Sequence, residues 1–185
     1  MEKVIEIKVE DIKRAFDEAN DNVKNCILNS FPQIREALPV TDRVKTFEDA
    51  CHESGIDPEQ YMSKYEDEPA DVIAYMKLRV ICKALNEGWR PKFVEGENRY
   101  FPYFRLYSSE EISQMSKEEK SSVVYRSAYY AYAYGGVSYA YANYDSAYVY
   151  ANIDSRLAFK TEELAKYAGK QFIDLWADFC LTKKK

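Results

Sequence analysis

Long apolar runs and secretion signals are missing from this sequence of 185 residues. No apolar stretch reaches the roughly 18–20 residues that a helix needs to span a bilayer. The charged start MEKVIEIK lacks the apolar segment of a signal peptide. We therefore expect no membrane association and a cytoplasmic location.

Residues that could form a metal or catalytic site are also scarce. The four cysteines, Cys26, Cys51, Cys82 and Cys180, form no CxxC pair, and His52 is the only histidine. Zinc sites normally need several such ligands at short spacing, so we expect free thiols and no metal. Adjacent helical residues point about 100° apart, so Cys51 and His52 are poorly placed to act together. Phosphate-binding loops, dinucleotide fingerprints and hydrolase motifs are lacking as well, so the sequence predicts no cofactor and offers no positive sign of catalysis.

Tyrosine is the residue that the sequence has in excess. Thirteen of the 17 tyrosines lie between Tyr100 and Tyr150, and residues 128–151 alternate largely between tyrosine and alanine. Alternation with a period of two is typical of a β-strand, in which successive side chains point to opposite faces. The stretch therefore predicts strands with one tyrosine face and one alanine face.

Two turn signals divide this stretch into three strands. Gly135-Gly136 can form a two-residue hairpin, and Tyr144-Asp145 is a second plausible turn between Asn143 and Ser146. Closing both turns predicts an antiparallel meander that aligns the tyrosines in rungs. The rungs are Tyr132–Tyr139–Tyr150 and Tyr130–Tyr141–Tyr148, opposite a face with Ala131, Ala140 and Val149.

Two arrangements of this sheet remain open. A face of alanines lets a helix approach closely, and tyrosine tolerates partial exposure because its hydroxyl can meet water. We therefore expect the alanine face to be buried and the tyrosine face to be exposed. The alternative buries the tyrosines, since their rings carry far more apolar area than methyl groups do.

The rest of the chain is predicted to be mainly helical. Helical periodicity extends from Val9 to Ser30, and Thr46, Asp57 and Thr161 are expected to cap later helices. Further segments with a clear pattern are an apolar helix that ends before Gly88, an aromatic strand over residues 99–107 that Pro102 should place at an edge or a bulge, and a C-terminal helix. The predicted fold class is α+β: a helical N-terminal part (1–95), then an antiparallel β-meander packed on a C-terminal helix (96–185), together one compact unit.

Four segments resemble a known group of proteins. They are TDRVKTFEDAC (41–51), KLRVICKALNEGWRP (77–91), YFPYF (100–104) and SRLAFKTEELAKYAGKQF (155–172). Together they resemble uncharacterised proteins encoded by phages and prophages of gut bacteria. The resemblance implies a viral or mobile-element origin and the cytoplasm of an infected or lysogenic bacterial host. It implies no activity and assigns no functional residues.

The tyrosine face is the predicted binding surface. Tyrosine-rich surfaces offer protein partners a large contact area at a small entropy cost, so we expect a small accessory protein that engages a host or viral protein. The alternative is a nucleotide or single-stranded nucleic acid, because rings stack on bases and arginine holds phosphate. An enzyme of unknown type is the third possibility. The candidate residues are Tyr130, Tyr132, Tyr139, Tyr141, Tyr148, Tyr150, Arg126 and Arg156.

Overall fold

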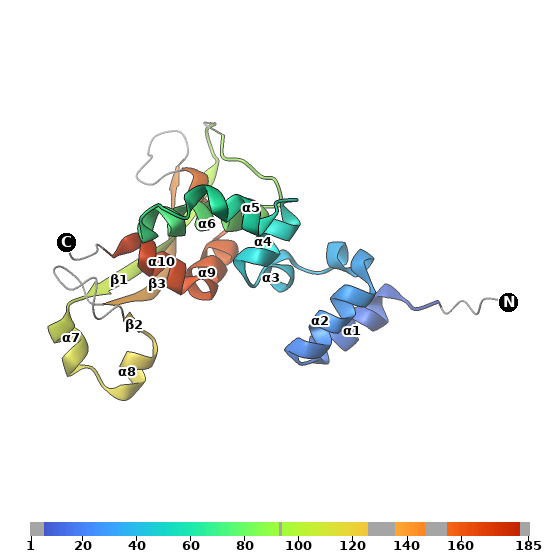
Figure 1. The fold of residues 1–185 in the computed structure, drawn as a ribbon, viewed down its shortest axis with the longest axis horizontal. Helices are drawn as coiled ribbons and strands as arrows, with labels where there is room; N and C mark the ends of the chain where they lie inside the picture. Colours follow the sequence, from blue (N-terminus) through green and yellow to red (C-terminus); the bar gives the residue numbers. More distant parts are fainter. Residues whose placement is uncertain (1–5, 93, 126–135, 147–154, 182–185) are drawn as a thin grey trace. The chain divides into compact units, whose positions relative to one another are not determined.

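A computed structural model describes residues 6–92, 94–125, 136–146 and 155–181. The chain divides into two compact units, Met1–Arg43 and Val44–Lys185, each described by itself (Figure 1). Among the described helices, none combines the length and the apolar composition that crossing a bilayer requires.

The first unit is a small helical cluster. Its elements are α1 (Val9–Glu18), α2 (Asp21–Ser30), η1 (Pro32–Ala37) and α3 (Val40–Arg43). The single helix predicted over Val9–Ser30 is wrong, because Asn20 starts a new helix by accepting a hydrogen bond from the Val23 amide. The core of the unit consists of Phe16, Leu28, Ile34 and Leu38.

The second unit is α+β, which confirms the predicted fold class. Its helices are α4 (Phe47–Glu53), α5 (Pro58–Met62), η2 (Ser63–Tyr65), α6 (Ala70–Leu85), α7 (Ser109–Gln114), α8 (Lys117–Ser121), η3 (Ser155–Leu157), α9 (Glu162–Gln171) and α10 (Ile173–Cys180). Its strands are β1 (Asn98–Tyr107), β2 (Val124–Tyr125) and β3 (Gly136–Ser146). The predicted caps Thr46, Asp57 and Thr161 are confirmed, because each side chain accepts a hydrogen bond from a first-turn amide.

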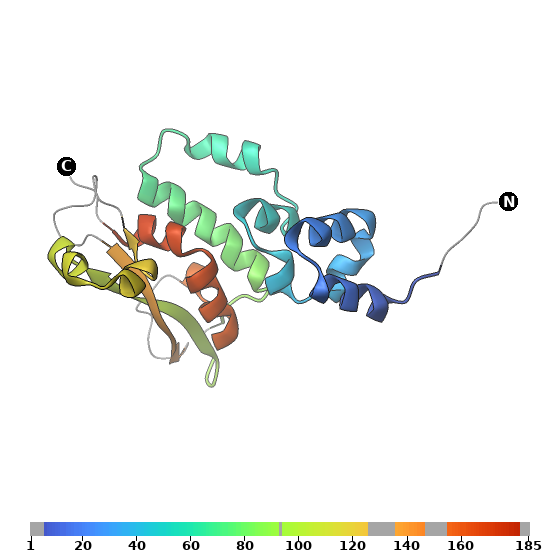
Figure 2. The ribbon, with the colours of Figure 1, turned by 90° about the horizontal axis from the view of Figure 1, so that it is seen from below.

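Helices cover one face of the sheet in two layers. Helices α9 and α10 lie against the strands, and α6 packs on α10 from the side away from the sheet (Figure 1 and Figure 2). The predicted single C-terminal helix is therefore two helices, which meet at Phe172, where φ is −110° and ψ is 30°. The buried face of α6 places Leu78, Ile81 and Leu85 in this core.

Helix α9 also joins the two ends of this unit. The Tyr167 hydroxyl donates a hydrogen bond to the carbonyl of Val44 at 2.7 Å, and the Gln171 amide donates to the carbonyl of Lys45 at 2.9 Å. These bonds connect backbone at the beginning of the unit to side chains more than a hundred residues later in the chain.

The sheet pairs strands differently from the predicted meander. Its order is β1-β3-β2, and β3 pairs antiparallel with β1 from Asn98↔Ser146 to Tyr107↔Gly136. Val137 is paired with Leu106 on one side and Val124 on the other, so the predicted hairpin pair of Val137 with Tyr134 is wrong. The predicted turn at Tyr144-Asp145 is also wrong, because β3 continues through it to Ser146. At Val137 and Gly136 the two edges of β3 are taken by β1 and β2, and at Tyr144-Asp145 the pairing with β1 continues where the turn was predicted.

A β-bulge interrupts the alternation of β3. Phe104 pairs with Tyr139 and Tyr103 pairs with Tyr141, so Ala140 has no partner in β1. One extra residue in a strand reverses the side on which the following side chains point. Tyr139 and Tyr141 therefore lie on opposite faces of the sheet. The sequence predicted a break of this kind near Pro102, which is one residue from the bulge.

Gly169 brings α9 into close contact with the sheet. A Cβ atom at this position would lie 2.6 Å from a ring carbon of Tyr139 and 2.8 Å from the Cβ atom of Pro102. Both distances are too short for carbon atoms in contact, so only glycine fits without movement of the strands. The glycine in the middle of α9 thus has a packing reason.

We expect Gly169→Ala to lower the free energy of unfolding by about 1–2 kcal/mol, measured by urea denaturation. Overpacking costs about 1–3 kcal/mol, and this exceeds the roughly 1 kcal/mol that alanine gains over glycine in a helix. Lys170→Ala, at an exposed neighbouring position of α9, should change stability by about 1 kcal/mol or less. A more stable Gly169→Ala protein would contradict the close contact.

Candidate functional site

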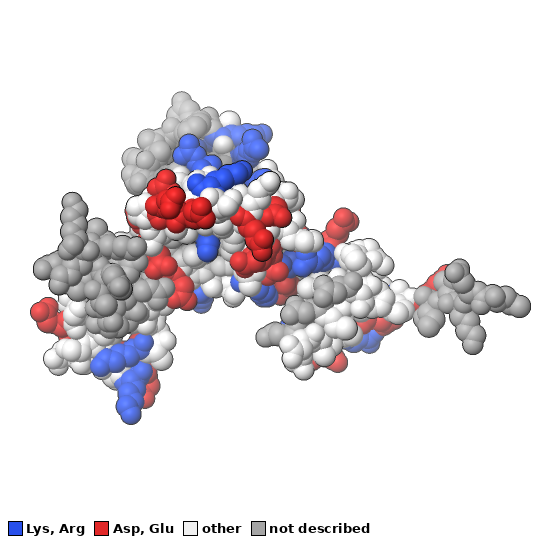
Figure 3. Space-filling view, viewed as in Figure 1, with Lys and Arg blue, Asp and Glu red and all other residues white. Residues whose placement is uncertain are grey.

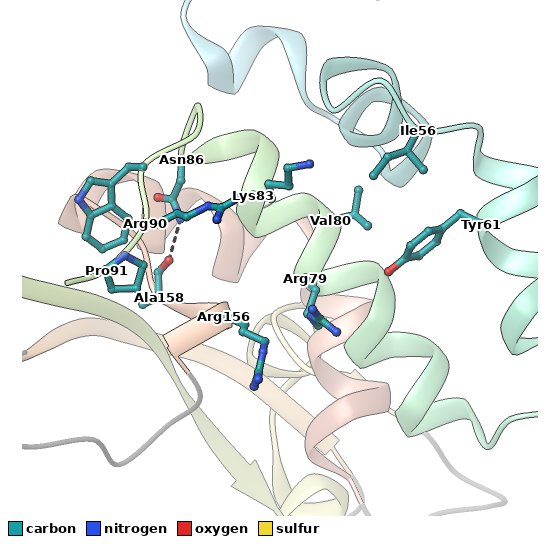
Figure 4. Close-up of a pocket in the computed structure, with 11 residues that line it drawn as sticks. Ile56, Tyr61, Arg79, Val80, Lys83, Asn86, Arg90, Pro91, Arg156 and Ala158 are labelled. Carbon is teal, nitrogen blue, oxygen red and sulfur yellow. Dashed lines mark hydrogen bonds between the residues drawn. The ribbon is translucent and has the colours of Figure 1, made fainter. Parts of the chain in front are cut away.

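A cleft with several basic residues beside α6 is the candidate site of the second unit. Its volume is about 510 Å³. Figure 4 shows its lining side chains converging from α6, from the chain after α6, from α5 and from the segment around η3. The lining residues are Ile56, Tyr61, Arg79, Val80, Lys83, Asn86, Trp89, Arg90, Pro91, Arg156 and Ala158. We call this site the basic cleft.

Helix α6 supplies two cations to the cleft. Arg79 and Lys83 are four residues apart, so they project from the same side of the helix, one turn from each other. The opposite side of α6 is anchored in the core, which fixes the helix under them. The Arg79 guanidinium lies 3.8 Å from the Met76 sulfur and 5.8 Å from the Tyr75 ring centroid. The guanidinium itself makes both contacts, which hold its charge beside the cleft.

The chain leaves α6 through a turn of left-handed residues. Glu87 has φ of 50° and Gly88 has φ of 83°, and the Trp89 amide donates to the carbonyl of Asn86 at 2.9 Å. This turn ends the helix and reverses the chain, which is the usual role of glycine after a helix. It brings Trp89 and Arg90 back to the cleft wall.

The opposite wall comes from residues much later in the chain. Arg156 belongs to η3, and Ala158 follows it in an extended segment. Phe159 exchanges two backbone hydrogen bonds with Tyr100 of β1, at 2.9 and 3.0 Å. Asn86 holds the same segment from the α6 side. Arg156 therefore faces Arg79 and Lys83 across the cleft because of long-range contacts.

Aromatic and apolar groups form the rest of the lining. The Tyr61 hydroxyl donates to the carbonyl of Met76 at 3.3 Å, and burial, together with nearby Tyr65, raises the pKa of Tyr61. Tyr61 is therefore a neutral phenol at physiological pH. Trp89, which also lines the cleft, is half-buried and contributes an indole ring.

The electrostatics of the cleft favour an anion. The four cations in its lining are Arg79, Lys83, Arg90 and Arg156, and the described lining includes no Asp or Glu. Within the described residues, no carboxylate forms an ion pair with Lys83 or Arg90. Figure 3 shows basic side chains gathered at the top of this unit, over the chain that follows α6, with acidic side chains in a separate area below.

This arrangement can hold phosphate and stack a planar ring. Arginine donates paired hydrogen bonds to phosphate oxygens, and lysine adds a compact charge. Tyrosine and tryptophan present flat faces on which a base can stack.

Among the described residues, no three His, Cys, Asp or Glu side chains come together as a metal site. Cys51 is fully buried in α4, and this burial raises the pKa of its thiol.

The structure describes three of the eight sequence-predicted binding residues. Arg126, Tyr130, Tyr132, Tyr148 and Tyr150 lie outside the described residues. Arg156 lies at the basic cleft, whereas Tyr139 and Tyr141 lie on the sheet.

The two described tyrosines do not share one face as predicted. Tyr139 lies under α9 against Gly169, with the Lys170 ammonium 5.4 Å from its ring centroid, and burial raises its pKa. Tyr141 is 53% exposed, and its ring stacks on Tyr103 at 5.1 Å with 6° between the planes. The bulge at Ala140 is the cause, because it reverses the side of the strand between them.

Sequence reasoning missed most of the cleft. Arg79 and Lys83 carried a usable signal, because these two cations lie one helical turn apart on a largely apolar helix. The run Trp89-Arg90-Pro91 carried a signal as well, because it combines a ring with a cation directly after the predicted end of this helix. Tyr61 gave no signal of its own, since only the folded chain brings it beside α6.

The bulge makes Tyr139 and Tyr141 a matched pair for mutation. We expect Tyr139→Ala to lower the free energy of unfolding by about 2–4 kcal/mol, because its ring packs under α9. Tyr141→Ala should cost about 1 kcal/mol or less, since its ring is half exposed. Urea denaturation of both variants gives the comparison. Equal costs would show that both rings share one environment, as the unbroken alternation predicts.

Tyr139→Phe provides the control for the hydroxyl group. The hydroxyl of Tyr139 is buried and makes no hydrogen bond within the part of the chain that the structure describes. Removing a buried group without a partner costs little, so this variant should be as stable as the wild type or slightly more stable.

Comparison with known proteins adds no relative. No protein-family model matches the chain, and neither the curated proteins nor the solved structures contain a match. The function is therefore to be inferred from the chemistry of the described residues.

Proposed function

We propose that the second unit binds a ligand that carries both phosphate and a planar base, in the basic cleft. The single observation behind this proposal is the set of four cations, without a described acidic residue, between two aromatic side chains. The phosphate would lie among the cations, and the base would stack on Trp89 or Tyr61. Each hydrogen bond to a charged group contributes about 1.5–3 kcal/mol, and a stacked base contributes about 1–3 kcal/mol.

Mononucleotides and single-stranded nucleic acids share this chemistry. A cleft volume of about 510 Å³ falls within the usual range of roughly 300–1,000 Å³ for small-ligand sites, which favours a mononucleotide. The net charge of −5 for the whole chain also disfavours strong non-specific binding to a polyanion. The proposal therefore places a nucleoside di- or triphosphate first.

A host or viral protein that docks on exposed tyrosines is the second candidate. Tyr141 and Tyr144 are 53% and 54% exposed, and exposed aromatic groups often mark protein interfaces. The resemblance to phage-encoded proteins supports such a setting. If these rings carry the binding of a partner, Tyr141→Ala lowers affinity for that partner and leaves nucleotide binding unchanged.

ATP and a fluorescein-labelled oligo-dT are the two probes for the proposed site. We expect ATP to bind in calorimetric titration, with Arg79→Ala and Arg90→Ala each weakening binding by roughly tenfold or more, through loss of a charged hydrogen bond. Anisotropy of the labelled oligonucleotide tests the single-strand alternative. Tighter binding of oligo-dT than of ATP would reassign the ligand to single-stranded nucleic acid.

Arg105→Ala is the matched control for net charge. Arg105 lies on β1, its side chain is 65% exposed, and it does not line the cleft. Its removal makes the same change in total charge, so affinity for ATP should change by less than about twofold in 0.15 M salt, where distant charges are largely screened. Equal losses for Arg105→Ala and Arg90→Ala, or no binding of either probe, would refute the proposed site.

A further inference from the structure

Asn86 is a buried amide at the end of α6 that contacts backbone 72 and 74 residues later in the chain. It is 4% exposed. Its Nδ2 atom donates to the carbonyl of Ala158 at 2.7 Å, and its Oδ1 atom accepts from the amide of Lys160 at 2.9 Å (Figure 4 shows the first of these bonds). One side chain therefore satisfies both the carbonyl and the amide of an extended segment.

The segment is held on its other side by the sheet. Between Ala158 and Lys160, the carbonyl and amide of Phe159 bond to Tyr100 of β1, at 3.0 and 2.9 Å. The polar groups of an extended chain alternate in direction, so β1 takes those of Phe159 and Asn86 takes those of its neighbours. The side chain of Asn86 thus makes the two hydrogen bonds that a neighbouring strand would otherwise make to this segment.

Arg156 lies two residues before the clamped segment. Leu157, between Arg156 and the clamp, is 1% exposed, and Ala158 is also 1% exposed, so the chain enters the core immediately after Arg156. Only Arg156, among the four cations of the cleft, comes from this part of the chain. The other three lie on α6 or on the turn after it. The hydrogen bond that closes this turn, from the Trp89 amide to the carbonyl of Asn86, involves only backbone atoms and does not need the Asn86 side chain.

We infer that Asn86 is a positioning residue that holds Arg156 at the basic cleft. Its importance for binding rests on the proposed function of the cleft, whereas its effect on residues 158–160 does not. Without the carboxamide, the Ala158 carbonyl loses its shortest hydrogen bond and the Lys160 amide loses its acceptor. The Cys82 thiol, 3.3 Å from the Ala158 carbonyl, and the exposed Lys160–Glu87 ion pair at 2.9 Å then hold this segment less firmly against α6. Arg156 therefore loses its fixed position, while Arg79, Lys83 and Arg90 keep theirs.

A double-mutant cycle separates positioning from a general loss of structure. We expect Asn86→Ala and Arg156→Ala each to weaken ATP binding by roughly tenfold, and the double variant to bind no more weakly than Arg156→Ala alone. In the double variant with Arg90→Ala, by contrast, the two effects should be independent, so the losses of ATP affinity of the single variants should multiply. The weakening of ATP binding by added salt should become smaller by the same amount in Asn86→Ala as in Arg156→Ala, because both lose the same charged contact. A merely structural role would not single out Arg156.

If Asn86→Ala weakened ATP binding by the same factor in the Arg156→Ala variant as in the Arg90→Ala variant, the inference would be wrong. Unchanged ATP affinity in Asn86→Ala would also overturn it. If Asn86→Ala does not fold, Asn86→Ser serves in the same cycle, because its short hydroxyl cannot reach both Ala158 and Lys160. Calorimetry on the full chain, with the ATP used for the wild type, gives all values.

Amide hydrogen exchange tests the clamp without any ligand. The Lys160 amide should exchange at least tenfold faster in Asn86→Ala than in the wild type, while amides within α6 remain protected. If the wild type binds no ATP, the proposed function fails, and this exchange measurement alone decides the role of Asn86. Unchanged protection of Lys160 would then overturn the inference.

Discussion

The antiparallel pairing of β1 with β3 is the interaction on which the rest of the second unit depends. It builds the sheet against which α9 and α10 pack, and it places Tyr100 where Phe159 can join the edge of β1. Through Phe159 the sheet fixes the segment that forms one wall of the basic cleft. The cleft is therefore a product of strand pairing, although most of its charged residues lie on a helix and a turn.

The basic cleft combines segments that are far apart in the sequence. Its residues come from 56–61, 79–91 and 156–158, and packing of α6 against both α4 and η3 brings them together. Arginine and lysine are seldom fully buried, so an apolar core helix carries its cations on the side that faces solvent. The concentration of charge in the cleft follows from this sorting together with the turn that returns Arg90 to the same side.

Local signals were sufficient for several elements and misleading for others. The caps at Thr46, Asp57 and Thr161 were predictable because each acts on amides within its own first turn. The turn predicted at Tyr144-Asp145 failed because β1, which is distant in the sequence, offers β3 a longer ladder, and the one predicted at Gly135-Gly136 failed because β2 pairs with Gly136 and Val137. Pro102 indicated an edge or a bulge in β1, but the extra residue Ala140 in β3 could not be located from the sequence, since tyrosine and alanine alternate through it without a break. Arg156 was predicted as a binding residue, but its neighbours in the cleft arrive through tertiary contacts.

The hydrogen bonds from α9 to Val44 and Lys45 have a consequence for synthesis on the ribosome. The donors Tyr167 and Gln171 are translated more than a hundred residues after the carbonyls that they bind. Long-range contacts of this kind form late, because a large loop must close first. The nascent chain thus holds α6 without α10, and Val44 and Lys45 without their donors on α9, until both C-terminal helices have emerged. This interval is when a chaperone has most apolar surface to protect.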